Sequence, residues 1–587
     1  MINADSNKQL RVAASLPSSP FGGLGKTGLL PARDSAVIFW DAYKIAKELP
    51  KSAMHRLQQF LLVLLLLGVM GYRGDAQETT ILLTAEGHDS RVDLRWTPCE
   101  DPQLRGYNVY RASSEEGPFL QLNAEPHGAC VYSDFIGEND REYFYRIGTI
   151  LWGESEGGDA SNFASAKTFA MNDDQLLTSV QEATFRYFWD HAHPTSGLAY
   201  ERGRTGHIPR NQGRAVACAI GGSGFGLIAL MIGAERGFVT REEAAERVLK
   251  ITTFLEEKGE RFHGVWPHWI NGETGTAIPF GSRSQDDGAD LVETSYMIQG
   301  MLTVRAYFDR DDPVEQEIRE RTTRLWQEVE WDFFLQHEGG KRLYWHWSPN
   351  YGWAKNLPIV GYNECMITYL LAIASPTHPI PPECYHEGWA SSHRYVNGET
   401  YYGIEQPVGP PMGGPLFMTH YTFMSFDPRN KRDAYCDYFE NSRRITLINR
   451  AHCIENPSGH LGYGPNVWGL TASDGPEGYR ASSPTRDMGT LAPTAAISAM
   501  PFTPDESMAA LRTLYSEYGD RIWGEYGFRD AMNLDRDWFA RSYIAIDQGP
   551  IICMIENHRT GLCWRMFMSN PEIQPMMDAI GFESTKP

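Results

Sequence analysis

The hydrophobic pattern of the chain changes once, near Met171, and this change restricts the folds that the chain can adopt. Between residues 78 and 168, apolar and polar residues alternate over short segments, which is typical of β-strands. After Met171, apolar residues recur every three or four positions, as on one face of an α-helix. A chain of 587 residues is also too long for one ordinary core. We therefore expect a small all-β domain, residues 78–168, and a large all-α domain, residues 172–587.

The β-rich segment contains four predicted strands separated by turn residues. The first, Arg91–Trp96, places Val92, Leu94 and Trp96 on one face. The others are Gly106–Arg111, Phe119–Leu122 and Glu142–Ile147. Such a segment is typical of a β-sandwich, and its Trp96, Gly-Tyr-x-Val-Tyr-Arg and Tyr-x-Tyr-Arg-Ile patterns resemble a fibronectin type III module. We expect a spacer without catalytic residues, with carbohydrate binding as the less favoured alternative.

A secretion signal is predicted upstream of this module. A basic start at Met54–Arg56 precedes the apolar run Phe60–Tyr72, and Gly74-Asp75-Ala76 offers small residues for a signal peptidase. The run is short for a membrane span, so a membrane anchor is the less favoured alternative. We predict a signal peptide over 54–76, and an unstructured extension or an over-extended reading frame over 1–53. The mature protein is expected to be secreted, in the periplasm of a Gram-negative bacterium.

Charge and composition exclude several classes of function. The formal net charge of −21 argues against a nucleic-acid partner, because phosphate binding requires a basic surface. The nine cysteines have no CxxC pair and no zinc spacing, so we expect them to be mainly small buried hydrophobic residues. Gly221–Gly226 reads Gly-Gly-Ser-Gly-Phe-Gly, but its context is helical on both sides, unlike a dinucleotide-binding loop. We expect these glycines to permit a tight turn and close helix packing, and we expect no cofactor.

The α-rich segment is predicted to begin with a helix that ends at His191 and is capped by Asp173 or Asp174. Many of the loops between its helices are aromatic and polar, as in Trp266-Pro-His-Trp269 and Tyr344-Trp-His-Trp347. A helical series with such loops indicates an α/α toroid, with a ligand in the funnel that the loops form. The further predicted helices cover residues 224–236, 240–258, 289–308, 313–335, 362–374, 431–454, 504–518 and 544–558.

Several carboxylates in this segment lie in apolar surroundings. Asp290 and Glu293, three residues apart, share one face of an otherwise apolar helix, and Asp286 precedes them. Such a stripe is costly unless it lines a polar cavity. Glu364 begins another apolar helix, and Asp547 stands alone between apolar runs. Paired carboxyl groups of this kind are what glycosidic bond cleavage requires. The alternative, which the residues leave open, is that these acids only cap helix N-termini.

Longer motifs resemble a known family. The motifs are Asp290–Leu302, Gly361–Glu364 with Ser375–Ile380, Gly414–Tyr421, Leu447–Pro457 and Ala545–Ile551, spread over about residues 180–580. They resemble the glycoamylase-like domain and, within it, glycoside hydrolase family 144, the bacterial β-1,2-glucanases. The resemblance implies an (α/α)6 barrel and hydrolysis of linear β-1,2-glucan to sophoro-oligosaccharides with inversion, without a metal cofactor. It also implies Asp290, Glu293, Glu364 and Asp547 as the catalytic carboxylates.

We expect Glu293 or Glu364 to be the general acid, and the other or Asp547 to be the base. We expect the enzyme to be endo-acting. We also expect a monomer that does not associate with the membrane after the signal peptide is cleaved. Three alternatives stay open: an exo-acting enzyme that releases a disaccharide, a transglycosylase, and a non-catalytic glucan-binding protein. The acidic stripe argues against the last, because binding alone does not need it. The expected sugar contacts are Asp286, Trp266, His268, Trp345, Trp347, Tyr362 and His420.

Overall fold

The computed structural model describes residues 81–153, 158–159, 161–206, 216–281, 285–393 and 395–585, within one compact unit, Thr79–Pro587. The predicted extension over 1–53 and the predicted signal peptide over 54–76 lie outside these residues. Within the described part of the chain, no helix combines the length and the apolar composition that crossing a membrane requires.

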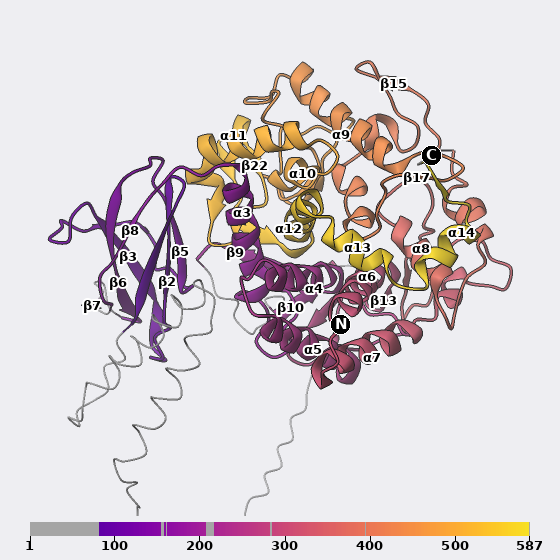
Figure 1. Ribbon diagram of the computed structural model, residues 1–587, viewed down its shortest axis with the longest axis horizontal. Coiled ribbons are helices and arrows are strands. Elements are labelled where there is room, and N and C mark those ends of the chain that lie inside the picture. Colours follow the sequence, from indigo (N-terminus) through magenta and orange to yellow (C-terminus); the bar gives the residue numbers. More distant parts are fainter. Residues whose placement is uncertain are drawn as a thin grey trace, which may run out of the picture. The chain divides into compact units, whose positions relative to one another are not determined.

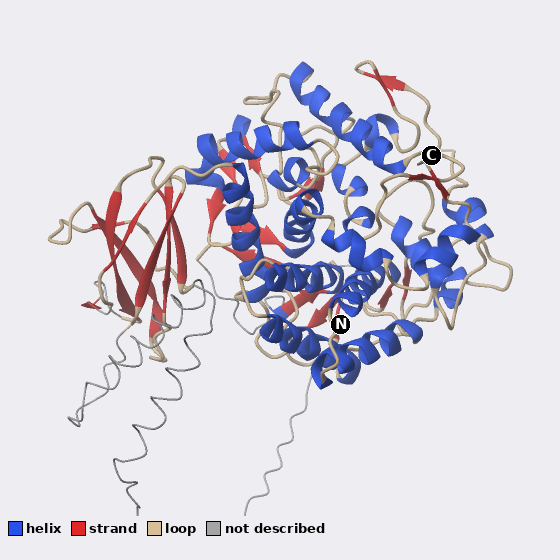
Figure 2. Ribbon diagram, viewed as in Figure 1, coloured by secondary structure: helices blue, strands red, loops and turns tan. Residues whose placement is uncertain are grey.

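The N-terminal part is a β-sandwich, as predicted (Figures 1 and 2). One sheet has the order β1 (Leu83–His88), β2 (Arg91–Trp96), β5 (Val131–Phe135). The other has the order β4 (Leu120–Gln121), β3 (Leu104–Ala112), β6 (Glu142–Leu151), β7 (Gly158–Asp159), and β8 (Ala164–Lys167) also pairs with β6. Trp96 of β2 meets Tyr107 of β3 with ring centroids 5.3 Å apart, so the predicted face of β2 lies in the core between the sheets.

The opposite face of β2 is buried as well, which the alternating pattern did not predict. Arg91 is 1% exposed and binds Asp93 with Nε at 2.8 Å. Its other guanidinium nitrogens donate to Ser179 Oγ at 2.9 Å and to Tyr515 OH at 2.8 Å. Since Ser179 and Tyr515 belong to the helical part of the chain, the sandwich is packed against that part through a buried charged side chain.

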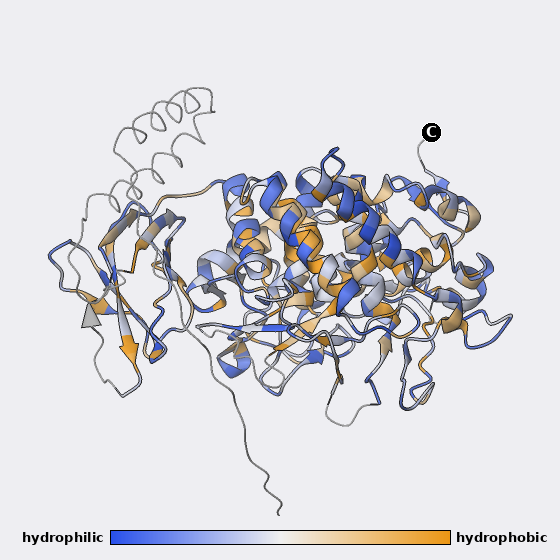
Figure 3. Ribbon diagram, turned by 90° about the horizontal axis from the view of Figure 1, so that it is seen from below, coloured by the Kyte–Doolittle hydropathy of each residue, from blue (hydrophilic) through white to orange (hydrophobic). Residues whose placement is uncertain are grey.

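The rest of the chain is mainly helical, as predicted. The long helices are α3 (Asp173–Trp189), α4 (Ile220–Glu235), α5 (Arg241–Glu257), α6 (Leu291–Tyr307), α7 (Pro313–Gln327), α8 (Met366–Ala374), α9 (Tyr438–Glu455), α11 (Pro504–Ile522) and α12 (Ala545–Arg559). Short helices α10 (Pro493–Ile497), α13 (Leu562–Met568) and α14 (Ile573–Ala579) were not predicted, because so few turns carry no clear period. Hydrophobic residues gather in the interior helices, and hydrophilic residues colour the outer ones (Figure 3).

Several helix ends differ from the prediction, and local contacts account for three of them. Asn172, not Asp173 or Asp174, caps α3, because Asn172 and Gln175 form a reciprocal capping box. Helix α7 stops at Gln327, and the backbone N–H of Glu330 donates to His263 O at 3.1 Å instead of extending the helix. Helix α9 begins only at Tyr438, where the Asp437 side chain accepts from the backbone N–H of Glu440.

The glycine-rich segment Gly221–Gly226 lies inside α4, so the predicted tight turn is wrong. The predicted close packing is confirmed. A Cβ atom on Gly224 would lie 2.3 Å from Tyr296 O, and one on Gly300 would lie 2.1 Å from Gly224 O. Helices α4 and α6 therefore touch through their backbones, which brings the N-terminal ends of both helices close together.

Candidate active site

A cleft of about 560 Å³ opens where the N-terminal ends of four helices meet. Ala219, Asp290 and Ile544 are the residues that precede α4, α6 and α12, and all three line the cleft. Glu364, just before α8, lines it too. Helix N-termini carry partial positive charge, which favours acidic and hydroxyl-rich groups at this end. The sequence thus places its buried acids where the helices present free N–H groups.

Asp290 is fully buried and organises one wall of the cleft. Its Oδ1 accepts the backbone N–H groups of Val292 and Glu293 at 3.1 and 2.9 Å, as a helix cap. Its Oδ2 meets His268 Nδ1 at 2.9 Å and accepts from Trp345 Nε1 at 3.2 Å. Burial tends to raise the pKa of Asp290, but the hydrogen bond and charge of His268 lower it overall. The capping role and the site role, which were alternatives at first, therefore belong to one side chain.

Glu293 lies one turn further along α6 and is 8% exposed. Its Oε2 accepts the backbone N–H of Gly221 at 2.7 Å, and its Oε1 lies 3.9 Å from His268 Nε2. Burial raises the pKa of Glu293 to about 7, although His268 opposes the shift. Burial would lower the pKa of His268, yet the charges of Glu293 and Asp290 raise it to about 9. A histidinium is thus held between two carboxyl groups.

Glu364 approaches the cleft from a different helix. Part of its side chain faces the cleft, yet protein surrounds it enough that burial raises its pKa to about 7. A carboxyl group in such surroundings keeps its proton near neutral pH, as a proton donor must.

Asp547, in the first turn of α12, is 1% exposed. It does not line the cleft, but its neighbour Ile546 does. Burial and then the charge of Asp530 raise the pKa of Asp547 well above its ordinary value. Burial, and then the charges of Asp547, Tyr479, Glu364 and Glu293, raise the pKa of Tyr421, which lines the cleft. Three predicted acids therefore act electrostatically on one tyrosine.

Of the predicted sugar contacts, Asp286, His268 and Trp345 line the cleft. Asp286 forms an ion pair with Lys355, and its Oδ1 lies 3.2 Å from His346 Nε2. The His268 ring also packs against Phe280, with centroids 3.9 Å apart, next to Trp269. This aromatic wall offers the flat surfaces on which sugar rings stack.

Four other predicted sugar contacts lie away from the cleft, and their assignment is corrected. Trp266 is fully buried, with Arg261 over its ring at 5.7 Å. Trp347 packs edge-on against His263, with centroids 5.0 Å apart. Tyr362 is 5% exposed and stacks on Tyr438. His420 is 1% exposed, and burial lowers its pKa to about 3. All four serve as packing residues in this structure.

Other lining residues were not predicted. Tyr421 belongs to a motif used for the resemblance, but its role there was not singled out. Tyr479, Lys355, Arg202 and Phe280 come from loops or very short strands, where neither the helical nor the strand period marks a position. The loop Trp266–Trp269 did attract attention for its aromatic residues, and His268 and Trp269 from it reach the cleft. Within the residues that the structure describes, no group of histidine, cysteine and acidic side chains is arranged to hold a metal ion.

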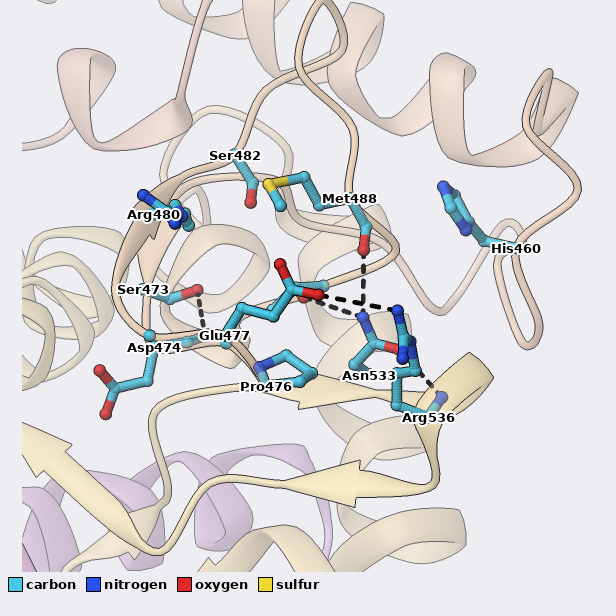
Figure 4. Close-up of a pocket in the computed structure, with 13 residues that line it drawn as sticks. His460, Ser473, Asp474, Pro476, Glu477, Arg480, Ser482, Met488, Asn533 and Arg536 are labelled. Atoms are coloured by element: carbon cyan, nitrogen blue, oxygen red, sulfur yellow. Dashed lines mark hydrogen bonds and ion pairs between the residues drawn. The ribbon is translucent and has the colours of Figure 1, made fainter.

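A second cavity, of about 190 Å³, adjoins the hairpin of β18 (Ala472–Ser473) and β19 (Arg480–Ala481) (Figure 4). Side chains alternate along this hairpin: Ala472 and Ala481 line the cleft, whereas Ser473 and Arg480 line the cavity. Glu477 pairs with Arg536 at 3.7 Å across the cavity. The hairpin thus separates the two spaces, and Asp290, Glu293 and Glu364 line the first.

Comparisons with known proteins find similar chains among glycoside hydrolases. The Glycoamylase family model, which describes a glucoamylase, matches residues 356–571. The exo β-1,2-glucooligosaccharide sophorohydrolase (non-reducing end) of Parabacteroides distasonis is 43% identical over 518 residues, 85% of this chain and 70% of that protein. The crystal structure of a β-1,2-glucanase from the same organism has a TM-score of 0.81 at 42% identity, over 87% of this chain and 74% of that chain.

A third similar structure is the endo-β-1,2-glucanase of Chitinophaga pinensis, in a complex with sophorotriose and glucose. It is 48% identical with a TM-score of 0.68, over 71% of this chain and 99% of that chain. These matches confirm the resemblance drawn from the sequence motifs. The chain belongs to the glycoside hydrolase family of these β-1,2-glucanases and sophorohydrolases, family 144, with its glycoamylase-like domain.

Proposed function

We propose that this protein hydrolyses linear β-1,2-glucan or its oligosaccharides by carboxylic acid/base catalysis. The observation that carries the proposal is that Glu293 and Glu364 line one cleft, while Asp547 is buried beside it, next to the lining residue Ile546. The linkage is supported by relatives named as β-1,2-glucanases and sophorohydrolases. The family pattern also supports the (α/α)6 barrel expected from the sequence, with α4, α6, α8 and α12 aiming their N-termini at the cleft.

In this mechanism Glu364 is the general acid and Asp547 is the general base. Glu364 donates its proton to the glycosidic oxygen as the C1–O bond breaks, and a water on the opposite face of the sugar attacks C1. Asp547 takes the proton of that water, so the product forms with inverted configuration. An inverting pair leaves room for the water, with carboxyl groups about 6.5–9.5 Å apart. Glu293 and His268 are proposed to bind the hydroxyl groups of the sugar.

Release of sophorose from a chain end is the first candidate for the mode of action. It is favoured because the relative named as an exo-acting sophorohydrolase matches 85% of this chain. Endo action, expected from the sequence, is the second candidate. It is favoured by the 48% identity to the endo-acting enzyme over 71% of the chain.

Product analysis tests the proposal. Purified protein is incubated with linear β-1,2-, β-1,3-, β-1,4- and α-1,4-glucans, and products are followed by chromatography and NMR. We expect cleavage of β-1,2-glucan alone, with sophorose from the first minutes for exo action or a ladder of oligosaccharides for endo action. The α-anomer should form first. A β-anomer contradicts inversion, and cleavage of another glucan instead contradicts the substrate.

Variants separate the roles. Glu364→Gln should lower kcat by about 1,000-fold, a typical loss for a general acid. An aryl sophoroside with a good leaving group should recover most of that loss, because it needs no proton donor, whereas Glu293→Gln should not be recovered. Glu246→Gln, an exposed position on α5, is the matched control. If the aryl sophoroside restored the activity of Glu293→Gln but not that of Glu364→Gln, Glu293 and not Glu364 would be the general acid.

We also propose that the mature protein is a secreted monomer that begins near Gln77. The basic, apolar and small-residue pattern of 54–76 supports secretion. Mass spectrometry of the protein recovered from the periplasm should show this N-terminus, and light scattering should give the mass of one chain. An intact N-terminus or retention in the cytoplasm would contradict the proposal.

A further inference from the structure

Asp530 lies next to Asp547 and belongs to neither the predicted site nor the lining of the cleft. It follows β21 (Gly527–Phe528) and is 2% exposed. Its Oδ2 accepts the backbone N–H of Asp474 at 2.6 Å. The carboxyl groups of Asp530 and Asp547 lie close enough to hydrogen-bond to each other. Two buried carboxyl groups on different segments of the chain therefore meet directly.

Contact between these two carboxyl groups requires that one of them carries a proton. Among the described residues, Asp530 Oδ1 and Asp547 Oδ2 are buried and receive no hydrogen bond from any donor group. Two carboxylates both accept hydrogen bonds, so they bond to each other only when one of them carries a proton. Two ionised carboxylates in contact would also repel strongly in a buried place. The pair therefore holds one proton between its two members.

The charges around the pair leave it without a cation of its own. Asp474 is the nearest further acid, and its carboxylate is bound by Arg202 and by Ser542 Oγ at 2.5 Å. Arg202 lowers the pKa of both acids, but on each of them the charge of Asp474, which raises the pKa, has the larger effect. The other titratable groups that interact with Asp547 are Tyr421 and Tyr479. Nothing in this set neutralises a second negative charge on the pair.

We propose that Asp530 is a positioning residue for Asp547: it shares one proton with it, fixes its orientation and sets the pH range in which it accepts a proton. The inference rests on the proposed function of Asp547 as the base. In the reactive form the proton lies on Asp530 and is donated to one oxygen of Asp547. The other oxygen of Asp547 accepts the proton of the attacking water. After the reaction both acids are protonated, and one proton leaves to solvent before the next turnover.

The variant Asp530→Asn tests this role. The amide keeps the shape of the side chain and donates an N–H to Asp547, but it carries no charge. Since the charge of Asp530 raises the pKa of Asp547, its removal lowers that pKa. The acidic limb of the pH profile of kcat/KM should therefore move to lower pH by at least one unit, with kcat at the optimum reduced less than tenfold. Asp530→Ala, which provides no hydrogen bond, should lower kcat at least 100-fold with little change in KM.

Asp520→Asn, which removes one carboxylate from an exposed position of α11, is the matched control and should keep the wild-type profile. An Asp530→Asn profile whose acidic limb coincides with that of the wild type would overturn the proposal, even if kcat falls, because a merely structural role lowers activity without moving the limb.

A second measurement does not depend on activity. Folding raises the pKa of both Asp530 and Asp547, so their contribution to stability is present at acidic pH and is lost as pH rises through the folded-state value. The melting temperature of the wild type should fall more steeply between pH 5 and 8 than that of Asp530→Asn. If no glucan is cleaved, the proposed function fails while this comparison still tests the shared proton. Equal slopes for the two proteins would overturn it.

Discussion

Gly221 donates its backbone N–H to Glu293 Oε2 over 2.7 Å, and a Cβ atom on Gly221 would lie only 2.6 Å from that same oxygen. The same Cβ would lie 2.8 Å from Tyr296 Cδ2 on the neighbouring turn of α6. Contacts this short force the surrounding groups to move. The absence of a side chain at residue 221 is thus what allows a helix N-terminus on α4 to hold a carboxylate of α6.

We predict that Gly221→Ala lowers kcat/KM about 100-fold, because a displacement of a site group by about 1 Å costs on that order. Helix propensity favours alanine over glycine by about 1 kcal/mol, so any loss of stability reports the displacement and not the helix. Gly464→Ala is the control, since a Cβ there meets no atom within 4 Å. Steady-state kinetics on β-1,2-glucan check the prediction, and unchanged kcat/KM in Gly221→Ala would contradict it.

The sequence predicts the long helices well because each buries one apolar face over several turns. Helix α5, for example, runs from Arg241 to Glu257 within the predicted 240–258. The ends are less predictable, since they depend on contacts with distant segments, such as that of Glu330 with His263. Helices α4 and α6 are buried on nearly all sides, and α6 contains no clear polar face. Their close contact followed from the glycines rather than from the period.

The interface between the sandwich and the helical part was not predictable from the strand pattern. Arg91 and Asp93 occupy the positions of β2 that the alternation assigns to solvent. We predict that Arg91→Ala lowers the free energy of unfolding by about 3–5 kcal/mol, because it leaves the buried Asp93 carboxylate without its charged partner. Its guanidinium also lies 4.4 Å from the Trp523 ring, and that contact is lost as well.

Chemical unfolding of the full chain measures this loss. The control is Arg141→Ala, which removes an exposed ion pair with Glu138 on the same module and should cost less than about 1 kcal/mol. Equal effects of the two variants would show that the sandwich and the helical part do not depend on Arg91 for their packing.

The acids that lie in or beside the cleft were predictable as a group, but their partners were not. Asp290, Glu293, Glu364 and Asp547 stand out because each interrupts an apolar stretch. Aromatic residues carry no such signal: Trp345 reaches the cleft, whereas Trp347, two positions further, packs against His263. Asp530 follows Phe528-Arg529 in an irregular segment and gives no pattern at all. The tertiary contacts that select among these residues have no local trace in the sequence.

We predict that replacing the charged Asp290 by asparagine lowers the pKa of His268, so that the imidazolium loses its proton nearer to neutral pH. Burial lowers the pKa of His268, and the charges of Glu293 and Asp290 raise it to about 9. In Asp290→Asn the helix cap is kept, since asparagine caps well, but one of the two negative charges is gone. The pKa of His268 should fall by more than one unit, measured by NMR titration of the histidine side chains with His268→Gln for assignment.

The control for this titration is Asp312→Asn, which removes the charge of an aspartate that caps another helix, α7, in the same way. Asp312 accepts from the backbone N–H groups of Val314 and Glu315, as Asp290 does from those of Val292 and Glu293. It should leave the His268 resonance in place. A His268 pKa that is unchanged in Asp290→Asn would show that Glu293 alone holds the imidazolium charge.

Glu364 makes the stability of the protein depend on pH in a direction opposite to that of ordinary surface acids. Burial raises its pKa from 4.5 to about 7. A group whose pKa is raised by folding contributes stability that is fully present below the unfolded value and is lost as pH rises through the folded value. Charging Glu364 in the native state costs at most about 3 kcal/mol, at 1.36 kcal/mol for each unit of pKa.

Glu364→Gln keeps the shape of the side chain and removes its titration. The variant should therefore unfold at nearly the same temperature as the wild type at pH 5 and at a higher temperature at pH 9, with the difference growing between them. Glu246→Gln, on the exposed face of α5, measures the effect of removing one carboxylate elsewhere. Differential scanning calorimetry at a series of pH values decides the matter. A difference that stays constant from pH 5 to 9 would mean that Glu364 is already ionised in the folded protein at pH 5, and it would remove the reason for assigning it as the proton donor.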